Sequence, residues 1–440
     1  MKRTNIFTII SLCALTVTSF AQDTITKFYP PEFTHIKEKY TIMDGDTTKI
    51  HGEYTKFFEE GEVAMKGQFV EGKPDGLFIE YYEDGKVLSK TTYENGKKTG
   101  AFEVYARTGE PIQKGNYVDG NLSGQVKSFY PNGDLKTDIF FENGIPNGNA
   151  VEYFEGGNKK QEFVYVNGKQ HGIAKTYYEN GKLSSEFTYQ NGIIQGKYLT
   201  FYSNGEKEWV YNYVNGYKNG PYQMYNKEGQ LIDEGSYIDG IFNGVRKTYY
   251  DSGKPKEIQQ FQKGAKIGEN ITFFETGEKM WVENYTKVTK DGTIREYYKS
   301  GQLKSEEIYI DGKKSKTWRT FYPDGKVESK TPYESGAVNG FVEVYNEKGQ
   351  LTTTIPYKFG RNTGIETSFY PNGKKHTTTS YLNGQKSGVY MEYSESGDIK
   401  VKGNHLYDVR QGTWNYYNEK MEVVKTETYS QGRLMSTTEN

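Results

Sequence analysis

A glycine that recurs every 24 residues constrains the fold of this chain more than any other feature. From Gly52 to Gly412 the series meets a glycine at fifteen of sixteen positions, and only Lys316 interrupts it. A fixed period of this size is typical of a repeat array, in which each unit buries its surface against its neighbours. The sequence therefore predicts sixteen 24-residue units over residues 52–435, with a cap or linker over 22–51 and a short tail over 436–440.

Aromatic residues keep fixed places within the repeat, whose positions are numbered 1 to 24 from the recurring glycine. Position 6 is aromatic in all sixteen units, position 7 in eleven, and position 18 in fifteen, with His405 as the exception. Hydrophobic residues make up only 34% of the chain, while Tyr and Phe number 40 and 24. We therefore expect aromatic rings to supply most of the buried area.

Two turn signals divide each unit. The first reads Tyr-Pro-Asn-Gly at 130–133 and 370–373, which suits a type I turn followed by a left-handed glycine. The second reads Asn-Gly or Asp-Gly, as at 95–96, which is the strongest short-range hairpin signal. About eight to ten residues separate successive turns, enough for one strand. The predicted fold is all-β: an elongated antiparallel meander of tandem β-hairpins that forms a solenoid-like single sheet.

The recurring glycine falls inside a strand, four residues after the second turn. It could form a β-bulge, or it could leave bare backbone on which an aromatic ring from the adjacent strand lies. The surplus of rings favours the second explanation. In both cases the glycine is structural.

Residues 1–21 have the order of a secretory signal peptide. Lys2 and Arg3 come first, an apolar stretch follows, and Ser19-Phe20-Ala21 stand at the expected cleavage site. We expect an exported protein of the periplasm, the outer surface or the medium, without a membrane span in the mature chain. The one cysteine, Cys13, lies in this segment, so the mature chain has no disulfide. The net charge of −1 becomes −3 after cleavage. Lysines and acidic residues are interspersed along the chain, which argues against nucleic-acid binding.

The strings YxNGKxxG, YYxNGKL and ExxYxNG resemble the MORN repeat in the variant form of bacterial proteins, over residues 52–435. The resemblance implies tandem β-hairpins that act as interaction modules. Some such chains are labelled YwqK-type antitoxins, which would imply a toxin partner, but an exported protein cannot neutralise a cytoplasmic toxin. The sequence departs from the repeat pattern at Val288, Lys316, Asp408 and Met421. It therefore does not predict the turns of the units that contain them.

No catalytic or metal site stands out from the repeat, so we expect no enzyme, no cofactor and no metal. The five histidines lack zinc-ligand spacing, and His405 is interpreted as a packed substitute for an aromatic residue. Asp44-Gly45-Asp46 has too few ligands for a calcium loop and is interpreted as a turn.

The rings at positions 6 and 18 are expected to form an aromatic ladder along one face of the sheet. The rings at position 7 should then point to the other face, where they either pack across the hairpin or form an exposed contact row. This row is the candidate interaction surface: Tyr82, Tyr130, Tyr178, Tyr202, Tyr250, Tyr298, Tyr322 and Tyr370. The predicted function is a non-enzymatic exported scaffold that binds a protein of unknown identity. The alternatives are a glycan-binding or cell-wall-binding repeat protein, which its four tryptophans disfavour, and a toxin-neutralising protein.

Overall fold

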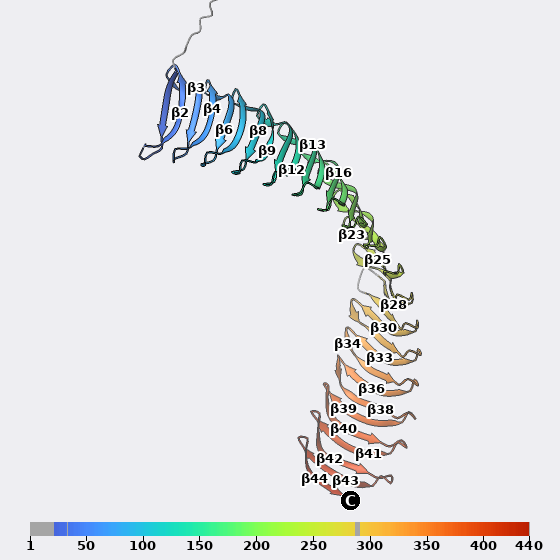
Figure 1. Ribbon diagram of the computed structural model, residues 1–440. Coiled ribbons are helices and arrows are strands. Elements are labelled where there is room, and N and C mark those ends of the chain that lie inside the picture. The colour runs from blue at the N-terminus through green and yellow to red at the C-terminus, as the bar shows by residue number, and fades with distance from the viewer. Residues whose placement is uncertain (1–21, 33, 287–290, 440) are drawn as a thin grey trace, which may run out of the picture. The chain divides into compact units, whose positions relative to one another are not determined.

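The computed structural model describes residues 22–32, 34–286 and 291–439, and within them the chain forms 44 strands and no helix (Figure 1). The expected signal peptide and Val288 lie outside these residues. The chain divides into two compact units, Met1–Gly205 and Glu206–Asn440, and each is described by itself.

The strands of the first unit are β1 (Gln22–Phe28), β2 (Ile36–Met43), β3 (Asp46–Phe57), β4 (Val63–Val70), β5 (Lys73–Pro74), β6 (Gly76–Tyr81), β7 (Val87–Glu94), β8 (Lys97–Tyr105), β9 (Pro111–Val118), β10 (Asn121–Leu122), β11 (Gly124–Phe129), β12 (Leu135–Glu142), β13 (Ile145–Tyr153), β14 (Lys159–Val166), β15 (Lys169–Gln170), β16 (Gly172–Tyr177), β17 (Leu183–Gln190) and β18 (Ile193–Phe201).

The strands of the second unit are β19 (Lys207–Val214), β20 (Tyr217–Lys218), β21 (Gly220–Tyr225), β22 (Leu231–Ile238), β23 (Ile241–Phe242), β24 (Gly244–Tyr249), β25 (Pro255–Gln262), β26 (Ala265–Lys266), β27 (Gly268–Phe273), β28 (Lys279–Tyr285), β29 (Gly292–Tyr297), β30 (Leu303–Ile310), β31 (Lys313–Lys314), β32 (Lys316–Phe321), β33 (Val327–Glu334), β34 (Ala337–Val338), β35 (Gly340–Tyr345), β36 (Leu351–Lys358), β37 (Arg361–Asn362), β38 (Gly364–Phe369), β39 (Lys375–Leu382), β40 (Gln385–Tyr393), β41 (Ile399–Leu406), β42 (Val409–Tyr417), β43 (Val423–Ser430) and β44 (Arg433–Glu439).

Within each unit the strands form an antiparallel meander, as the sequence predicted. β6 pairs with β7, β7 with β8 and β8 with β9, and the second unit follows the same order. Among the described residues of each unit, no pairing joins the first strand to the last, so each sheet is open. Residues 22–51 join the sheet as β1, β2 and the start of β3, and β44 runs through residues 436–439.

Both predicted turn types are present. In the first turn, the N–H of Gly85 donates to the carbonyl of Tyr82 (2.9 Å), and Gly85 has a φ of 80°. In the second, Asn95 and Gly96 both have positive φ (50° and 85°), as a two-residue type I′ turn requires. The N–H of Gly96 also donates to the carbonyl of Pro74 (2.9 Å), which ties this turn to the preceding repeat.

The recurring glycine has positive φ, as a β-bulge requires, in every repeat that carries it except the one at Gly292. The expectation that an aromatic ring covers it is wrong at Gly100, although a Cβ added to Gly148 would lie 3.4 Å from the ring of Phe140. At Gly100, φ is 66°, and the pairing between β7 and β8 shifts register at this point. A Cβ added to Gly100 would meet only the Cβ of Thr92, at 4.0 Å, and no ring. The glycine is therefore needed because the extra residue of the bulge takes a left-handed conformation, which costs an L side chain energy.

Lys316 takes the same conformation without being glycine. Its φ is 57°, and it stands at the position that glycine holds in the other units. We expect Lys316→Gly to raise the free energy of unfolding by about 1 kcal/mol, because the left-handed region costs about that much for an L residue. The measurement is urea denaturation followed by circular dichroism.

Lys313→Gly is the matched control for this substitution. Lys313 is an exposed residue of β31 whose φ is not in the left-handed region. Glycine there should lower the free energy of unfolding by about 0.5–1 kcal/mol, through the entropy of the unfolded chain. Equal effects of the two substitutions would show that Lys316 carries no backbone strain.

The alternation of side chains divides each repeat between two faces. In the repeat that starts at Gly76, the third-position face carries positions 3, 5, 14, 16 and 18, which are Phe78, Glu80, Ser89, Thr91 and Tyr93. The second-position face carries positions 2, 4, 6, 15 and 17, which are Leu77, Ile79, Tyr81, Lys90 and Thr92. The cross-strand pairs are consistent with this division, since Phe78 pairs with Thr91 and Leu77 pairs with Thr92.

The best-buried side chains stand at position 3 and share space with their cross-strand partners at position 16. In eight strand pairs one partner is large and the other is small, and where position 3 is alanine its partner is phenylalanine. The pairs with this volume exchange are Tyr54–Gly67, Phe78–Thr91, Phe102–Gly115, Ala150–Phe163, Ala174–Phe187, Tyr222–Gly235, Trp318–Thr331 and Tyr390–Gly403. In these eight pairs the small residue on one strand makes room for the large residue on the other, as close packing demands. Trp414 does not follow this exchange, because it pairs with Glu427.

Rings do lie over bare backbone, but at the glycines of position 16. A Cβ added to Gly115 would come within 2.8 Å of the Phe102 ring, and one added to Gly67 would overlap the ring of Phe78. The ring-over-glycine contact that the sequence suggested is thus present at a different position of the repeat.

Candidate interaction surfaces

The tyrosines at position 7 connect consecutive repeats. The hydroxyl of Tyr82 donates to the carbonyl of Tyr105 (2.8 Å), and Tyr178 donates in the same way to Phe201 (2.6 Å). The same bond, 23 residues along the chain, is made by Tyr130, Tyr250, Tyr298, Tyr322 and Tyr370. Tyr29, ahead of the first repeat, donates to Phe57 (2.8 Å). These hydroxyls hold the end of one hairpin to the next.

The rings of this row are partly buried, that of Tyr202 included, and several are covered by a cation. The guanidinium of Arg107 lies 5.2 Å from the ring centroid of Tyr82, and Lys136 Nζ lies 5.5 Å from that of Tyr130. Cation–π contact of this kind stabilises an exposed ring by about 0.5–1 kcal/mol. The geometry thus gives the row a structural role, and a role in binding stays a prediction.

Positions 6 and 18 do not form one ladder, because they stand on opposite faces. Position 18 contacts position 3, as in the pair of Phe78 and Tyr93 with ring centroids 4.9 Å apart. Position 6 instead meets charged side chains of the second-position face: Tyr177 donates to Glu162 (2.6 Å) and Tyr249 to Glu234 (2.8 Å). Burial and the bond to Glu234 raise the pKa of Tyr249 to about 12.

On the third-position face, buried carboxylates have several donors each. Asp233 accepts from Tyr222 (2.7 Å) and from Arg246 (2.6 Å). Glu427 accepts from Lys425 (2.7 Å), and also from the hydroxyls of Tyr416 (2.6 Å) and Tyr429 (2.9 Å). The hydrogen bonds from Lys425 and Tyr416 hold the pKa of Glu427 at about 2. These carboxylates act as structural acceptors, because their oxygens are already paired.

His405 packs as expected for a substitute aromatic residue. Its ring centroid lies 5.1 Å from that of Trp414 and 5.7 Å from that of Tyr390, and burial lowers its pKa. Within the described residues, no group of three or more His, Cys, Asp or Glu could hold a metal ion. That part of the chain also lacks a helix long and apolar enough to cross a membrane.

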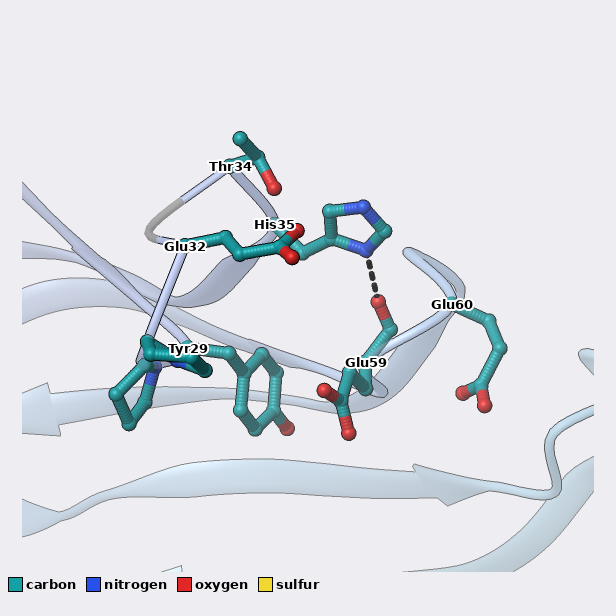
Figure 2. Close-up of a pocket in the computed structure, with 8 residues that line it drawn as sticks. Tyr29, Glu32, Thr34, His35, Glu59 and Glu60 are labelled. Carbon is teal, nitrogen blue, oxygen red and sulfur yellow. Dashed lines mark hydrogen bonds between the residues drawn. The ribbon is translucent and has the colours of Figure 1, made fainter.

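A pocket of about 330 Å³ lies beside the N-terminal strands (Figure 2). Tyr29, Glu32, Thr34, His35, Glu59 and Glu60 line it, and His35 Nδ1 lies 2.5 Å from the carbonyl oxygen of Glu59. The loop that carries this pocket includes Phe33, which is outside the described residues, so we assign it no ligand.

Sequence reasoning missed an exposed apolar patch beside the second turns of the second unit, here called the rung patch. Val214 pairs with Tyr217, and Ile238 with Ile241, on either side of successive turns. The exposed fractions of the four side chains are 43%, 62%, 51% and 51%. The N–H of Gly240 donates to the carbonyl of Lys218 (2.8 Å), which places the two pairs on neighbouring hairpins. An apolar pair flanking Asn-Gly or Asp-Gly was the signal available in the sequence.

Comparison with known families identifies the repeat. The model described as "MORN repeat variant" matches residues 74–95, 122–143, 170–191, 242–263, 290–311, 314–335 and 362–383. These segments share one register, from position 23 to position 20 of the next unit. No curated protein matches the chain.

Solved structures give only a weak likeness. The crystal structure of TcdB2-TccC3-Cdc42 is 10% identical, with 90% of this chain and 27% of that chain covered and a TM-score of 0.14. The Tc holotoxin pore of Photorhabdus luminescens is 10% identical over 89% of this chain and 24% of that chain, also with a TM-score of 0.14. The chain thus spans about a quarter of the length of these proteins, and scores this low carry no argument about function.

Proposed function

Since the chain is a MORN repeat variant protein, we propose that it is a non-enzymatic, exported scaffold that binds another protein through its sheet surface. MORN repeats are generally protein-interaction repeats. Export is proposed from the basic, apolar and small-residue order of residues 1–21. N-terminal sequencing of the chain from its native host should find Gln22 first, and an intact Met1 terminus would contradict export.

The rung patch is the observation that carries this proposal. Exposed apolar side chains that stand singly are normal on a protein surface, whereas contiguous groups mark contact sites. The two pairs of the patch are neighbours, and Val245 (48% exposed) follows on the next strand, β24. An aromatic residue among aliphatic ones is typical of the anchors that hold most of the energy of a protein interface.

The test is capture of envelope proteins by the tagged mature chain and by its variant Tyr217→Ser/Ile238→Ser/Ile241→Ser. The variant should lose the captured partner and keep its melting temperature, because the replaced side chains already meet water. The matched control is Leu382→Ser/Leu406→Ser/Val409→Ser, which changes side chains beside two other second turns and exposed by 53%, 43% and 41%.

The tyrosine row predicted from the sequence is the second candidate contact surface. Its variant replaces Tyr130, Tyr178, Tyr202 and Tyr250 by phenylalanine, which removes the hydroxyls and keeps the rings. Partner loss in this variant alone, with the fold intact, would place the contact at the tyrosine row. If all three variants capture the same proteins as the unaltered chain, neither surface is the binding site.

A further inference from the structure

A hollow of about 370 Å³ lies on the third-position face of the first unit, over β7. Its walls are the rings of Phe78, Tyr93, Phe102 and Tyr117, and Thr91 lies on the strand between them. Small-molecule sites in proteins have volumes of this order, aromatic walls and a few polar groups.

The hollow exists because two rings lean in opposite directions. Phe78 on β6 leans over Gly67 of β4, and Phe102 on β8 leans over Gly115 of β9. Both rings therefore turn away from Thr91 on β7, although Thr91 is the cross-strand neighbour of both. Its short side chain does not fill the space, whereas Phe163 and Phe187 occupy the same repeat position in later units.

Polar groups complete the lining. Ser89 donates through its hydroxyl to Glu80 (2.7 Å), and Gln113 adds an amide. Lys98 Nζ lies 5.2 Å from the ring centroid of Tyr117. Glu80 and Lys98 are the two charged residues of the lining, and their charges are opposite. The hollow thus offers flat apolar surfaces and hydrogen-bonding groups with no net charge.

We propose that this hollow binds a short neutral stretch of saccharide. A sugar ring has apolar C–H faces that pack on aromatic rings, and hydroxyls at its edge that pair with carboxylate, amide, hydroxyl and ammonium groups. The lack of net charge favours a neutral sugar over an acidic one, because a buried charge needs a partner of opposite sign. This binding is separate from the protein contact at the rung patch, which lies in the second unit.

The first arm of the test is binding of the mature chain to a printed array of neutral and acidic oligosaccharides. We expect retention on neutral glycans and not on acidic ones. The second arm is calorimetry with the best neutral glycan. Thr91→Phe, which fills the hollow with a ring that this repeat position accepts elsewhere, should raise Kd at least tenfold. Gln113→Leu, which removes a hydrogen-bonding group, should raise it severalfold.

Thr331→Phe is the matched control, because Thr331 pairs with Trp318 across the strands as Thr91 pairs with Phe78. It should leave Kd unchanged, and the melting temperatures of all variants report whether the fold survives. The proposal is overturned by an array without neutral binders, or by binding that Thr91→Phe and Gln113→Leu both leave intact. Loss of protein capture in Thr91→Phe without any saccharide binding would instead make the hollow part of a protein contact surface.

Discussion

Replacing Trp414 by alanine is expected to lower the free energy of unfolding by about 3–5 kcal/mol, as found for large-to-small changes in protein cores. The side chain is 1% exposed, and its ring covers the backbone of Gly403. It stacks on Tyr390 at a centroid distance of 5.3 Å, and its Nε1 donates to the carbonyl of Asn404 (3.2 Å). The loss should concentrate in β40 to β43, because repeats contact only their neighbours. Urea denaturation measures the loss in free energy of unfolding, and hydrogen exchange of the backbone amides of β40 to β43 shows where the loss occurs.

Trp281→Ala is the control for this change. It removes the same ring from β28, where the side chain is 37% exposed. We expect less than half the loss seen for Trp414, because much of the Trp281 ring already meets water. Equal losses would mean that position 3 is not the core of the sheet.

Arg246→Ala should lower the free energy of unfolding by roughly 3–5 kcal/mol, as much as Trp414→Ala, because it leaves a buried carboxylate without its cation. The Asp233 side chain is 12% exposed, and both of its oxygens accept from Arg246. Hydrogen bonding to Asp233 raises the pKa of Arg246, so the guanidinium stays charged. Urea denaturation of the variant measures the loss.

A double-mutant cycle separates the interaction energy of the Asp233–Arg246 pair from the effects of each residue's other contacts. Asp233→Ala/Arg246→Ala should be less destabilised than Arg246→Ala alone, because no unpaired charge is left buried. Arg319→Ala is the matched control, since Arg319 is 44% exposed and its partner Glu306, 3.1 Å away, keeps a second cation in Arg295 (2.9 Å). The loss of one exposed cation from such a site should cost at most about 1 kcal/mol, so a similar small loss in Arg246→Ala would contradict the assigned role of Asp233.

Most of the backbone could be predicted from the sequence, because its signals are local. Asn95 and Gly96 accept positive φ whatever surrounds them, so the type I′ turn follows from their identity. The 24-residue period then repeats the same two turns and joins neighbouring strands by default. Even Lys316 and Met421 take the left-handed conformation of the glycines they replace, because the neighbouring strands impose it.

The side-chain arrangement could not be predicted in the same way. The sequence left open whether the recurring glycine formed a bulge, and the bulge decides which residues of β7 and β8 stand opposite each other. One ladder of positions 6 and 18 was expected, yet these positions fall on opposite faces once the register is known.

Position 3 escaped notice because its residue type varies, from Ala174 to Trp414. In the units where one partner is large and the other is small, its burial follows from the volume that it shares with position 16 across the strand pair, as in Ala174 with Phe187. The sequence by itself therefore determined the turns, the strand order and the meander, because these depend on backbone preferences of a few neighbouring residues. Only the tertiary structure decided the faces, the core pairs and the hollow over Thr91, because these depend on which side chains meet across strands and on how much space each leaves for the other.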